Sequence, residues 1–262
     1  MPKWGYSKSD YSYDEENHTI AKGLASIKYM GSGVGERLYE IAHKQTYTRF
    51  IDVLLALKNE SCVNSKQIDI LIKIDFFSEF GNQRELLRIV ELFDKLFDRG
   101  DAKKIKRELV DSTPIGKIVE KYSTGVTKSG SLAKSYTLLD IVSIMQEVED
   151  SIKQIHMDDL SDTIKVRNFA DAMGYAGYIS NKEEDRRKLY IADVFPLVRK
   201  KDGKQFGYSI VTKSIGSGKE SRFTVFNSLY NKDPIKPGDI VYCSNFVREG
   251  QYFKLTGYSK VF

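Results

Sequence analysis

The sequence lacks long apolar runs and is poor in cysteine. No apolar stretch among its 262 residues approaches the roughly 18 residues that a membrane-spanning helix requires. The opening segment MPKWGYSKSDYSYDEENH contains no apolar core of a secretion signal. The two cysteines, Cys62 and Cys243, are far apart and have no metal-ligand spacing. We therefore expect a cytoplasmic protein with reduced thiols.

Metal and cofactor signatures are missing or incomplete. The glycines at 31, 33 and 35 depart from a dinucleotide-binding fingerprint, because position 36 is glutamate. The segment SIGSGKES departs from a P-loop, since Lys213 and Glu220 replace the required glycine and hydroxyl residue. The three histidines, His18, His43 and His156, have no nearby Cys/His/Asp arrangement at metal-ligand spacing. The sequence therefore predicts no cofactor, no metal site and no catalytic residue.

Positive charge is mild in total but unevenly placed. The formal net charge is +5, and residues 189–262 contain twelve Lys/Arg against six Asp/Glu. The chain also has sixteen tyrosines and fourteen phenylalanines. Because aromatic rings beside basic side chains suit stacked bases, the basic C-terminal part indicates a polyanionic partner. A solvated basic surface is the alternative.

Apolar periodicity predicts helices in the first part of the chain. Four segments carry apolar residues on one helical face: GERLYEIAHK, YTRFIDVLLAL, NSKQIDILIKI and GNQRELLRIVELFDKLF. Asn64 or Ser65 is a plausible N-cap for the third segment, and Asn82 for the fourth. Joined by short turns, these helices form a compact module at residues 1–97.

A helical connector is predicted at residues 98–186. Its basic run KKIKR, at 103–107, either contacts a nucleic acid backbone or lies on a solvated helix. The following STGVTKSGSLAKS is rich in Ser, Thr and Gly. A strong helix is predicted for TLLDIVSIMQEVEDSIKQI, with Thr137 and Asp140 as a capping box. Another helix, KVRNFADAMGYAGYI, leads to the last module.

The pattern changes to β-strands in residues 187–262. Five runs are rich in β-branched and aromatic residues: LYIADVFPLVRK, QFGYSIVTKS, SRFTVFNS, DIVYCSNFVRE and QYFKLTGYSKVF. A short helical NSLYNK stands between the third and fourth runs. This is the arrangement of an OB-fold barrel. The predicted fold is thus α+β and multidomain: a helical module, a helical connector and a five-stranded barrel.

The stretch SIKYMGSGVGERLYEIAHK places an apolar residue and Gly-x-Gly between two short helices. Such a hairpin presents amides at a helix N-terminus, where an anion is favoured. Met30 to Gly33 resembles the hairpin of the helix-hairpin-helix motif, which holds the DNA backbone without reading sequence. A helix-helix turn that needs glycine only for geometry is the alternative. The candidate backbone contacts are Lys28, Gly31, Ser32, Gly33, Gly35 and Arg37.

The order of these motifs resembles a known family over residues 6–97 and 165–262. The pairs Gly23-Leu24 and Ile27-Lys28, the glycine hairpin, Phe77 and Gly81-Asn82 are similar to the tandem helix-hairpin-helix region of the bacterial DNA polymerase III alpha subunit. NFADAMGYAGYIS resembles the segment before that family's OB domain, and SRFTVFNSLYNK resembles the domain's third strand and helix. The resemblance implies that the helical module holds duplex DNA and that the barrel lies near single-stranded template.

The chain departs from the family at three points. Asp75 stands where the second hairpin usually has glycine, so that hairpin is expected to be structural. The family's clamp-binding peptide, of the Gln-x-x-Leu/Met-Phe type, is not evident. The polymerase palm with its metal-binding aspartates, which the family places N-terminal to this region, is absent. We therefore expect a non-catalytic chain, either an excised C-terminal fragment or a separate piece of a split polymerase.

The resemblance places single-stranded DNA on the second and third barrel strands and in the first and fourth loops. Phe206, Tyr208, Phe223 and Phe226 lie on those strands, and strand alternation lets about half of them face outward. We expect weak sequence specificity and a steep dependence on salt. The candidate single-strand contacts are Arg199, Lys200, Lys201, Lys204, Tyr208, Lys213, Arg222 and Phe223.

Two other functions fit the sequence. A protein-docking platform for the sliding clamp, the clamp loader or a separate polymerase chain would keep its affinity at salt concentrations that remove DNA. An RNA-binding barrel is a further alternative, because OB folds bind RNA as well, and competition between DNA and RNA oligomers distinguishes it. No membrane partner is expected.

Overall fold

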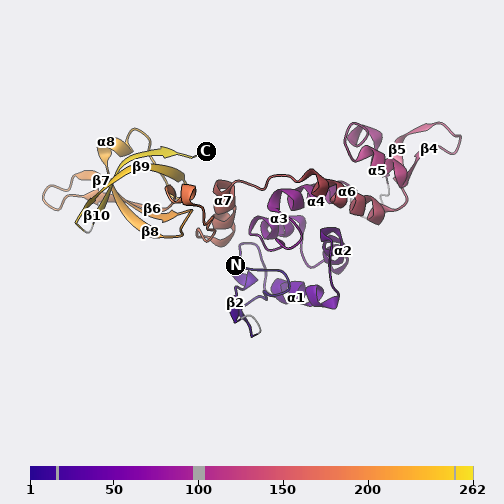
Figure 1. Cartoon of the computed structure of the whole chain (residues 1–262), viewed down its shortest axis with the longest axis horizontal. Helices are drawn as coiled ribbons and strands as arrows, with labels where there is room; N and C mark the ends of the chain where they lie inside the picture. The colour runs from indigo at the N-terminus through magenta and orange to yellow at the C-terminus, as the bar shows by residue number, and fades with distance from the viewer. Residues whose placement is uncertain (16–17, 97–103, 251, 262) are drawn as a thin grey trace. The chain divides into compact units, whose positions relative to one another are not determined.

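A computed structural model describes residues 1–15, 18–96, 104–250 and 252–261, and the chain divides into two compact units (Figure 1). The first unit comprises Met1–Ala25 and Tyr29–Asp159, and the second comprises Ser26–Lys28 and Leu160–Phe262. The predicted junction between helical module and connector, at residues 97 and 98, lies outside the described residues. Across the described part, no helix is long and apolar enough to cross a membrane.

The four predicted helical segments of the first unit form α-helices. They are α1 (Val34–Lys44), α2 (Phe50–Glu60), α3 (Ser65–Lys73) and α4 (Gln83–Leu96). Asn64 Oδ1 accepts the N–H of Gln67 at 3.0 Å, and Asn82 Oδ1 accepts the N–H of Glu85 at 3.0 Å. In both pairs the asparagine N–H donates back to the partner's side chain. The predicted caps are therefore confirmed, and each stabilises its helix by about 1 kcal/mol.

Helix α2 takes its cap from a distant part of the chain. Its own N-cap residue, Arg49, makes no side-chain cap bond. Glu149, on α6 (Ile141–Ile155), is fully buried and accepts the N–H groups of Phe50 at 3.0 Å and Ile51 at 2.9 Å. Lys153 lies 2.7 Å from the same carboxylate. This contact brings α6, predicted to lie in the connector, into the first unit.

The N-terminal segment packs into an aromatic core. Trp4 is 3% exposed, and its backbone N–H donates to the carbonyl of Phe76 at 3.0 Å. The centroid of its ring lies 5.4 Å from that of Phe77. Phe50 of α2 lies 5.2 Å from Phe77 on another side. A single tryptophan contributes a large apolar area, so this otherwise polar segment is held to the helices.

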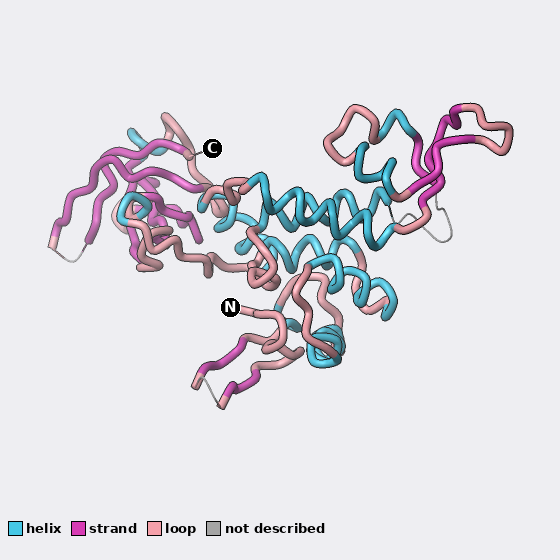
Figure 2. The backbone as a smooth tube through the Cα atoms, turned by 45° about the vertical axis from the view of Figure 1, so that its right-hand side comes forward, coloured by secondary structure: helices cyan, strands magenta, loops and turns pink. Residues whose placement is uncertain are grey.

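Two small sheets complete the first unit (Figure 2). Strands β1 (Ser12–Asp14) and β2 (Thr19–Ala21) pair antiparallel. Strands β3 (Lys104–Lys106), β5 (Leu132–Leu138) and β4 (Ser123–Val126) form an antiparallel sheet in that order, beside η2 (Arg107–Leu109) and α5 (Gly116–Lys121). The sequence analysis missed this sheet, because its Ser-, Thr- and Gly-rich strands read as a connector. The helical alternative for the basic run at 103–107 is wrong for Lys104–Lys106, which form β3, while Arg107 begins η2; Lys103 lies outside the described residues.

The capping box predicted for α6 is half wrong. Thr137 lies in β5, and α6 begins at Ile141. Asp140 is the cap: its Oδ1 accepts the N–H of Ser143 at 3.0 Å, and its Oδ2 accepts the Ser143 hydroxyl at 2.6 Å. A strand can run to within three residues of a helix when a single aspartate caps that helix.

The second unit contains the predicted barrel, preceded by α7 (Asp162–Met173) and η3 (Glu183–Asp185). Its strands are β6 (Lys188–Val198), β7 (Gln205–Ser214), β8 (Glu220–Phe226), β9 (Ile240–Glu249) and β10 (Tyr252–Lys260). They close in the order β10-β8-β7-β6-β9, and the β8–β10 pair is parallel while the others are antiparallel. The short α8 (Asn227–Tyr230) follows β8. The predicted five-stranded, OB-like barrel is therefore confirmed.

Candidate nucleic-acid interface

The first hairpin connects η1 (Leu24–Ser26) to α1. Met30 is 7% exposed, so this apolar residue anchors the hairpin. Gly33 precedes α1 with a left-handed backbone (φ 87°), which glycine adopts without strain. Gly31 and Ser32 are exposed, and their N–H groups have no hydrogen-bond partner within the described residues. The hairpin thus offers two exposed donors beside the positive end of a helix.

The N–H of Gly33, the next donor expected in the hairpin, already has a partner. The N–H of Gly33 donates to the Ser9 hydroxyl at 3.3 Å. The N–H of Ser9 in turn donates to Glu36 Oε1 at 3.2 Å, and the Ser9 hydroxyl donates to Glu36 Oε2. The hydrogen bond from Ser9 is the main cause that lowers the pKa of Glu36. A carboxylate therefore lies in the first turn of α1, close to the exposed amides.

Gly35 has a packing role. It is buried, and a Cβ placed on it would overlap the backbone of Lys8 and Ser9. A Cβ on Gly23 would overlap the backbone of Ser9 and Asp10 in the same way. The two glycines allow the N-terminal segment to pass against η1 and α1. The expectation that Gly35 contacts DNA therefore finds no exposed surface to support it.

The two predicted cations differ in their surroundings. Lys28 is exposed and belongs to the second unit, where its N–H donates to the carbonyl of Ala172 at 2.9 Å. Arg37 is half-exposed and binds Glu40 at 3.1 Å and Glu60 at 2.6 Å. These carboxylates, Glu40 first, raise the pKa of Arg37. Exposed ion pairs contribute about 0–1 kcal/mol, so a phosphate can compete for this guanidinium.

A cation that the sequence analysis missed lies beside the hairpin. Lys66 Nζ is 3.4 Å from the ring centroid of Tyr29, a 65% exposed tyrosine next to Met30. Gln67 Nε2 donates to the carbonyl of Tyr29 at 2.8 Å and so ties the start of α3 to the hairpin. Lys66 lies near the first hairpin only because α3 packs against Tyr29, and the sequence around Lys66 gives no signal of this contact.

The second hairpin, between α3 and α4, is closed to an anion. Asp75 adopts the left-handed backbone (φ 63°) that glycine would adopt more easily. Its Oδ1 accepts Gln83 Nε2 at 3.0 Å, and its N–H donates to the carbonyl of Ile72 at 3.0 Å. Because a carboxylate lies at its centre and the Asp75 N–H is engaged, this hairpin is unfavourable for an anion, which agrees with the expectation that it is structural.

In the barrel, two predicted stacking rings face inward. Phe223 is 6% exposed and belongs to the barrel core, opposite Ile210 in the β7–β8 register. Tyr208 packs against the same core and stacks on Tyr230, with centroids 3.7 Å apart and planes at 21°. Strand alternation gives both residues the inner face. Neither ring is placed to stack on a nucleic acid base, and this expectation is corrected.

The other two rings named on these strands form a partly exposed pair. Phe226 on β8 lies 6.1 Å from Phe206 on β7. Lys254 Nζ lies 4.4 Å from the Phe226 centroid, and the Arg199 guanidinium lies 5.9 Å from that of Phe206. Opposite Phe226 stands the buried Gly207, where a Cβ would overlap the carbonyl of Val225, so β7 and β8 approach closely at this point. By strand alternation Phe206 shares the face of Tyr208, so Phe226, beside Lys254, is the ring of this pair that faces outward and suits base stacking.

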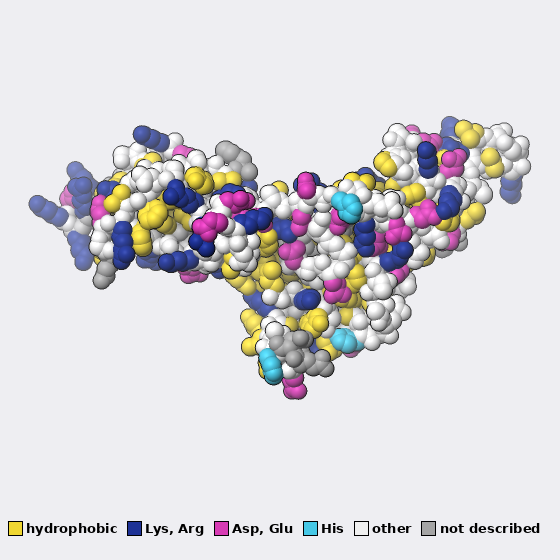
Figure 3. All heavy atoms as spheres, viewed as in Figure 1, with side chains coloured by type: hydrophobic (Ala, Val, Ile, Leu, Met, Phe, Trp, Pro, Cys, Tyr) yellow, Lys and Arg dark blue, Asp and Glu magenta, His cyan; other side chains and the backbone are white. Residues whose placement is uncertain are grey.

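The remaining predicted cations lie at two places on the barrel. Arg199, Lys200, Lys201 and Lys204 are exposed on the tight β6–β7 loop, where the Arg199 N–H donates to the Lys204 carbonyl at 2.9 Å. Arg222 is exposed on the outer face of β8 opposite Val211, and Lys213 is half-buried opposite Glu220. Figure 3 shows dark-blue Lys and Arg side chains gathered over the barrel, at the left of the view.

The fourth loop adds aromatic residues that the sequence analysis did not name. Phe246 on β9 is 46% exposed and lies 5.9 Å from Phe253 on β10. The Arg248 guanidinium lies 5.9 Å from the Phe253 centroid, and Tyr252 is 75% exposed. The available signal in the sequence was the group of aromatic residues at the adjacent ends of the fourth and fifth strands. A strand that packs only into the core alternates polar and apolar residues more regularly.

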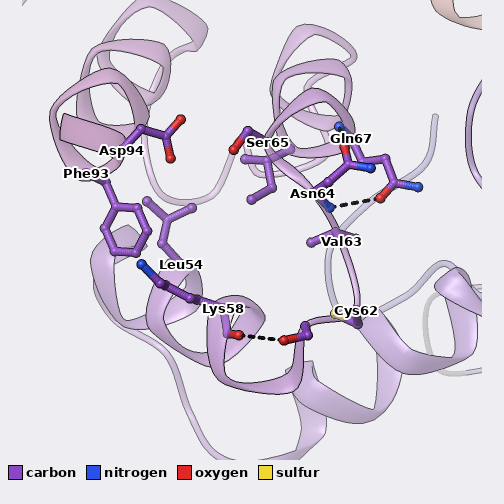
Figure 4. Close-up of a pocket in the computed structure, with 11 residues that line it drawn as sticks. Leu54, Lys58, Cys62, Val63, Asn64, Ser65, Gln67, Phe93 and Asp94 are labelled. Carbon is purple, nitrogen blue, oxygen red and sulfur yellow. Dashed lines mark hydrogen bonds between the residues drawn. The ribbon is translucent and has the colours of Figure 1, made fainter. Parts of the chain in front are cut away.

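A pocket of about 670 Å³ lies in the first unit, between α2, α3 and α4 (Figure 4). Lys58 and Asp94 are at its wall, and Lys58 Nζ lies 5.5 Å from the Phe93 ring. Burial raises the pKa of Asp94 and of the Cys62 thiol. No cluster of metal-ligating side chains occurs anywhere in the described ranges. With one cation and one carboxylate, the pocket has no preference for a polyanion.

Comparison with known proteins supports the assignment of the first hairpin to a helix-hairpin-helix motif. Residues 5–87 match the family described as helix-hairpin-helix motif. A segment of 96 residues is 30% identical to "DNA polymerase III subunit alpha" of Ureaplasma parvum. This segment is 36% of the chain and 10% of that protein, so the chain spans about a tenth of its relative. The resemblance to the C-terminal region of the DNA polymerase III alpha subunit is confirmed by matches over the N-terminal part of this chain.

Proposed function

We propose that the chain is a non-catalytic DNA-binding region of a replicative polymerase alpha subunit. The helical module holds duplex DNA, and the barrel holds single-stranded template. The observation that carries the proposal is the pair of exposed N–H groups at Gly31 and Ser32, beside the start of α1, which have no partner in the part of the chain that the structure describes. Donors of this kind favour a phosphate oxygen and read no base.

The duplex site is smaller than the sequence indicated. Gly31 and Ser32 donate to phosphate, Lys66 supplies a positive charge next to them, and Arg37 can exchange Glu60 for a phosphate. Gly33 supplies the left-handed turn, and its N–H remains with Ser9. Lys28 contributes charge from the exposed surface of its own unit.

The single-strand site combines charge with stacking. Arg199, Lys200, Lys201 and Lys204 attract the backbone from the first loop, and Phe226 offers a ring face on the outer side of β8. The fourth loop adds Phe246 and Tyr252. Such surfaces bind single strands of any base sequence, because every base has an aromatic face that can stack on a ring.

The test separates the two sites. Gly31 has open space around it, so Gly31→Val adds bulk without a clash and blocks the approach of a phosphate. We expect duplex affinity to fall about tenfold or more, since a hydrogen bond to a charged group contributes about 1.5–3 kcal/mol. Single-strand affinity stays unchanged. Ser78→Val, at an exposed position of the second hairpin, is the matched control. Equal loss of duplex and single-strand binding by Gly31→Val would contradict the division of labour.

Protein partners in the replisome are a second proposal. The β1–β2 hairpin exposes Tyr11, Tyr13 and Ile20 at 68%, 59% and 69%, a group of apolar side chains that a DNA backbone would not use. A partner bound there would keep its affinity at high salt. Pull-down of the clamp, the clamp loader or a polymerase chain at increasing salt concentrations tests this.

A further inference from the structure

The three-stranded sheet β3-β5-β4 lies in a basic part of the first unit. Residues 104–139 contain seven Lys/Arg and three Asp/Glu. Lys106, Arg107 and Lys121 are balanced by Glu108, Asp111 and Glu147. The remaining four lysines have no carboxylate partner within the described residues: Lys104, Lys117, Lys128 and Lys134. The uncompensated charge is therefore positive and attracts a polyanion.

Strands β4 and β5 form a ribbon that projects from the rest of the unit, as both backbone views show (Figures 1 and 2). A single arginine holds its two strands together close to the turn. Arg107 Nε donates to the carbonyl of Ala133 on β5 at 2.9 Å, and Arg107 Nη2 donates to the carbonyl of Gly125 on β4 at 3.1 Å. Its Nη1 donates to the buried Tyr136 hydroxyl at 2.7 Å. The ribbon is thus a braced two-stranded element.

The end of the ribbon has a well-formed turn and an exposed apolar pair. Thr127 and Ser131 exchange backbone and side-chain bonds of 2.8 and 3.2 Å. Just behind the turn, Val126 and Leu132 stand directly opposite each other, 59% and 75% exposed. Lys128 lies in the turn, and Lys134 follows two residues after Leu132. Apolar side chains flanked by lysines are typical of elements that enter a DNA groove.

The composition of this surface favours duplex over single-stranded DNA. Residues 104–139 contain two aromatic residues, Tyr122 and Tyr136. Tyr136 is buried beneath Arg107, and the Tyr122 hydroxyl, at 2.5 Å, donates to Glu147. No exposed ring is available to stack on a base, which single-strand sites depend on. A two-stranded ribbon, in contrast, has the width that the major groove admits.

We infer that the β4–β5 ribbon is an additional contact to duplex DNA, distinct from the glycine hairpin. Lys128 and Lys134 neutralise backbone phosphates, and Val126 and Leu132 contact the groove. This inference rests on the proposed function, because it extends a duplex that the helix-hairpin-helix module already holds. The ribbon lies outside residues 5–87, the part that matches the helix-hairpin-helix family.

The experiment compares two double variants of the full chain, with a labelled 30-base-pair duplex over a range of salt concentrations. Lys128→Gln with Lys134→Gln removes the two unpaired lysines. Lys95→Gln with Lys121→Gln removes the same charge from lysines already paired with Glu91 and Glu147. The slope of log affinity against log salt should fall by about 1.8 in the first variant, since each phosphate contact contributes about 0.9. The control should keep nearly the wild-type slope.

A second variant probes the apolar pair. Val126→Ser with Leu132→Ser should weaken duplex binding at every salt concentration without changing the slope, because apolar contact releases no counterions. Thermal unfolding verifies that the variants keep the fold. Wild-type slope and affinity in both ribbon variants would overturn the ribbon contact and favour a protein-docking ribbon. Absence of duplex binding by the wild type would instead overturn the proposed function, and the ribbon contact with it.

Discussion

The N–H of Ser9 donates a 3.2 Å hydrogen bond to Glu36 Oε1, while the Ser9 hydroxyl accepts the N–H of Gly33 at 3.3 Å. One serine thus links the N-terminal segment, the first turn of α1 and the glycine hairpin. The carboxylate of Glu36 occupies part of the region to which an anion is drawn. A phosphate that approaches Gly31 and Ser32 meets this negative charge.

Glu36→Gln should strengthen duplex binding. Because hydrogen bonding from Ser9 lowers the pKa of Glu36, the carboxylate is ionised at neutral pH and repels phosphate. An exposed charge near a helix end is worth about 0.3–1 kcal/mol, so we expect a gain of about two- to fivefold at low salt. Titration at low and high salt measures it, with Glu91→Gln on α4 as control. Weaker duplex binding by Glu36→Gln would contradict the site.

Glu149→Ala should destabilise the first unit strongly. The change leaves the N–H groups of Phe50 and Ile51 buried without a partner, at a cost of about 3 kcal/mol or more in the free energy of unfolding. Glu147→Ala, on the same helix, removes a solvent-screened ion pair with Lys121 and the bond from the Tyr122 hydroxyl, and should cost much less than Glu149→Ala. Urea unfolding compares the two variants, and equal losses would show that the Glu149 cap is not important.

Phe226→Ala should weaken single-stranded DNA binding. If a base stacks on this ring beside Lys254, its removal costs about 1–3 kcal/mol. Duplex affinity should not change. Tyr11→Ala, at an exposed ring of the first unit, controls for general loss of aromatic surface. Fluorescence titration with an oligothymidine measures both, and an unchanged affinity in Phe226→Ala would remove the outer face of β7 and β8 from the single-strand site.

The stability of the barrel should fall in strongly alkaline solution. Burial, with Asp233 and Tyr230 nearby, raises the pKa of Tyr258 to about 12, and its hydroxyl donates to the carbonyl of Asp233 at 2.5 Å. The unfolded chain has a tyrosine pKa of about 10. The contribution of Tyr258 is therefore complete below pH 10 and is lost as the pH rises through 12.

Tyr258→Phe tests this dependence. The variant should be less stable than the wild type at pH 8, by about 1 kcal/mol for the lost hydrogen bond. The difference should shrink between pH 10 and 12, where only the wild type has this tyrosine to titrate. Urea unfolding at several pH values gives the comparison. A constant difference over that range would contradict the assignment.

Local signals in the sequence were sufficient for the helices, their asparagine caps and the five barrel strands. Asn64 and Asn82 cap helices that start one residue later, so each signal and its effect lie within four residues. The barrel strands could be predicted in the same way, because each is a short run of β-branched and aromatic residues bounded by turn residues. The Ser/Thr/Gly-rich strands β4 and β5 gave no such signal, and they depend on Arg107 for part of their bonding.

Contacts between distant residues decided the rest of the candidate site. Ser9 lies 24 residues from Gly33, and Glu149 lies 99 residues from Phe50, so neither partner could be found from sequence spacing. The register of β7 and β8 decides that Phe223 faces the core while Phe226 faces outward. Strand alternation predicted that the rings would divide between the faces; it did not predict which ring would take which face.

The most direct test is a titration of labelled duplex and single-stranded DNA into the wild type and Gly31→Val, over a range of salt concentrations. The account predicts that the wild type binds both, with log affinity falling linearly against log salt, and that Gly31→Val loses duplex binding alone. Absence of duplex binding by the wild type at low salt would contradict it. The hairpin would then be only a turn between two helices.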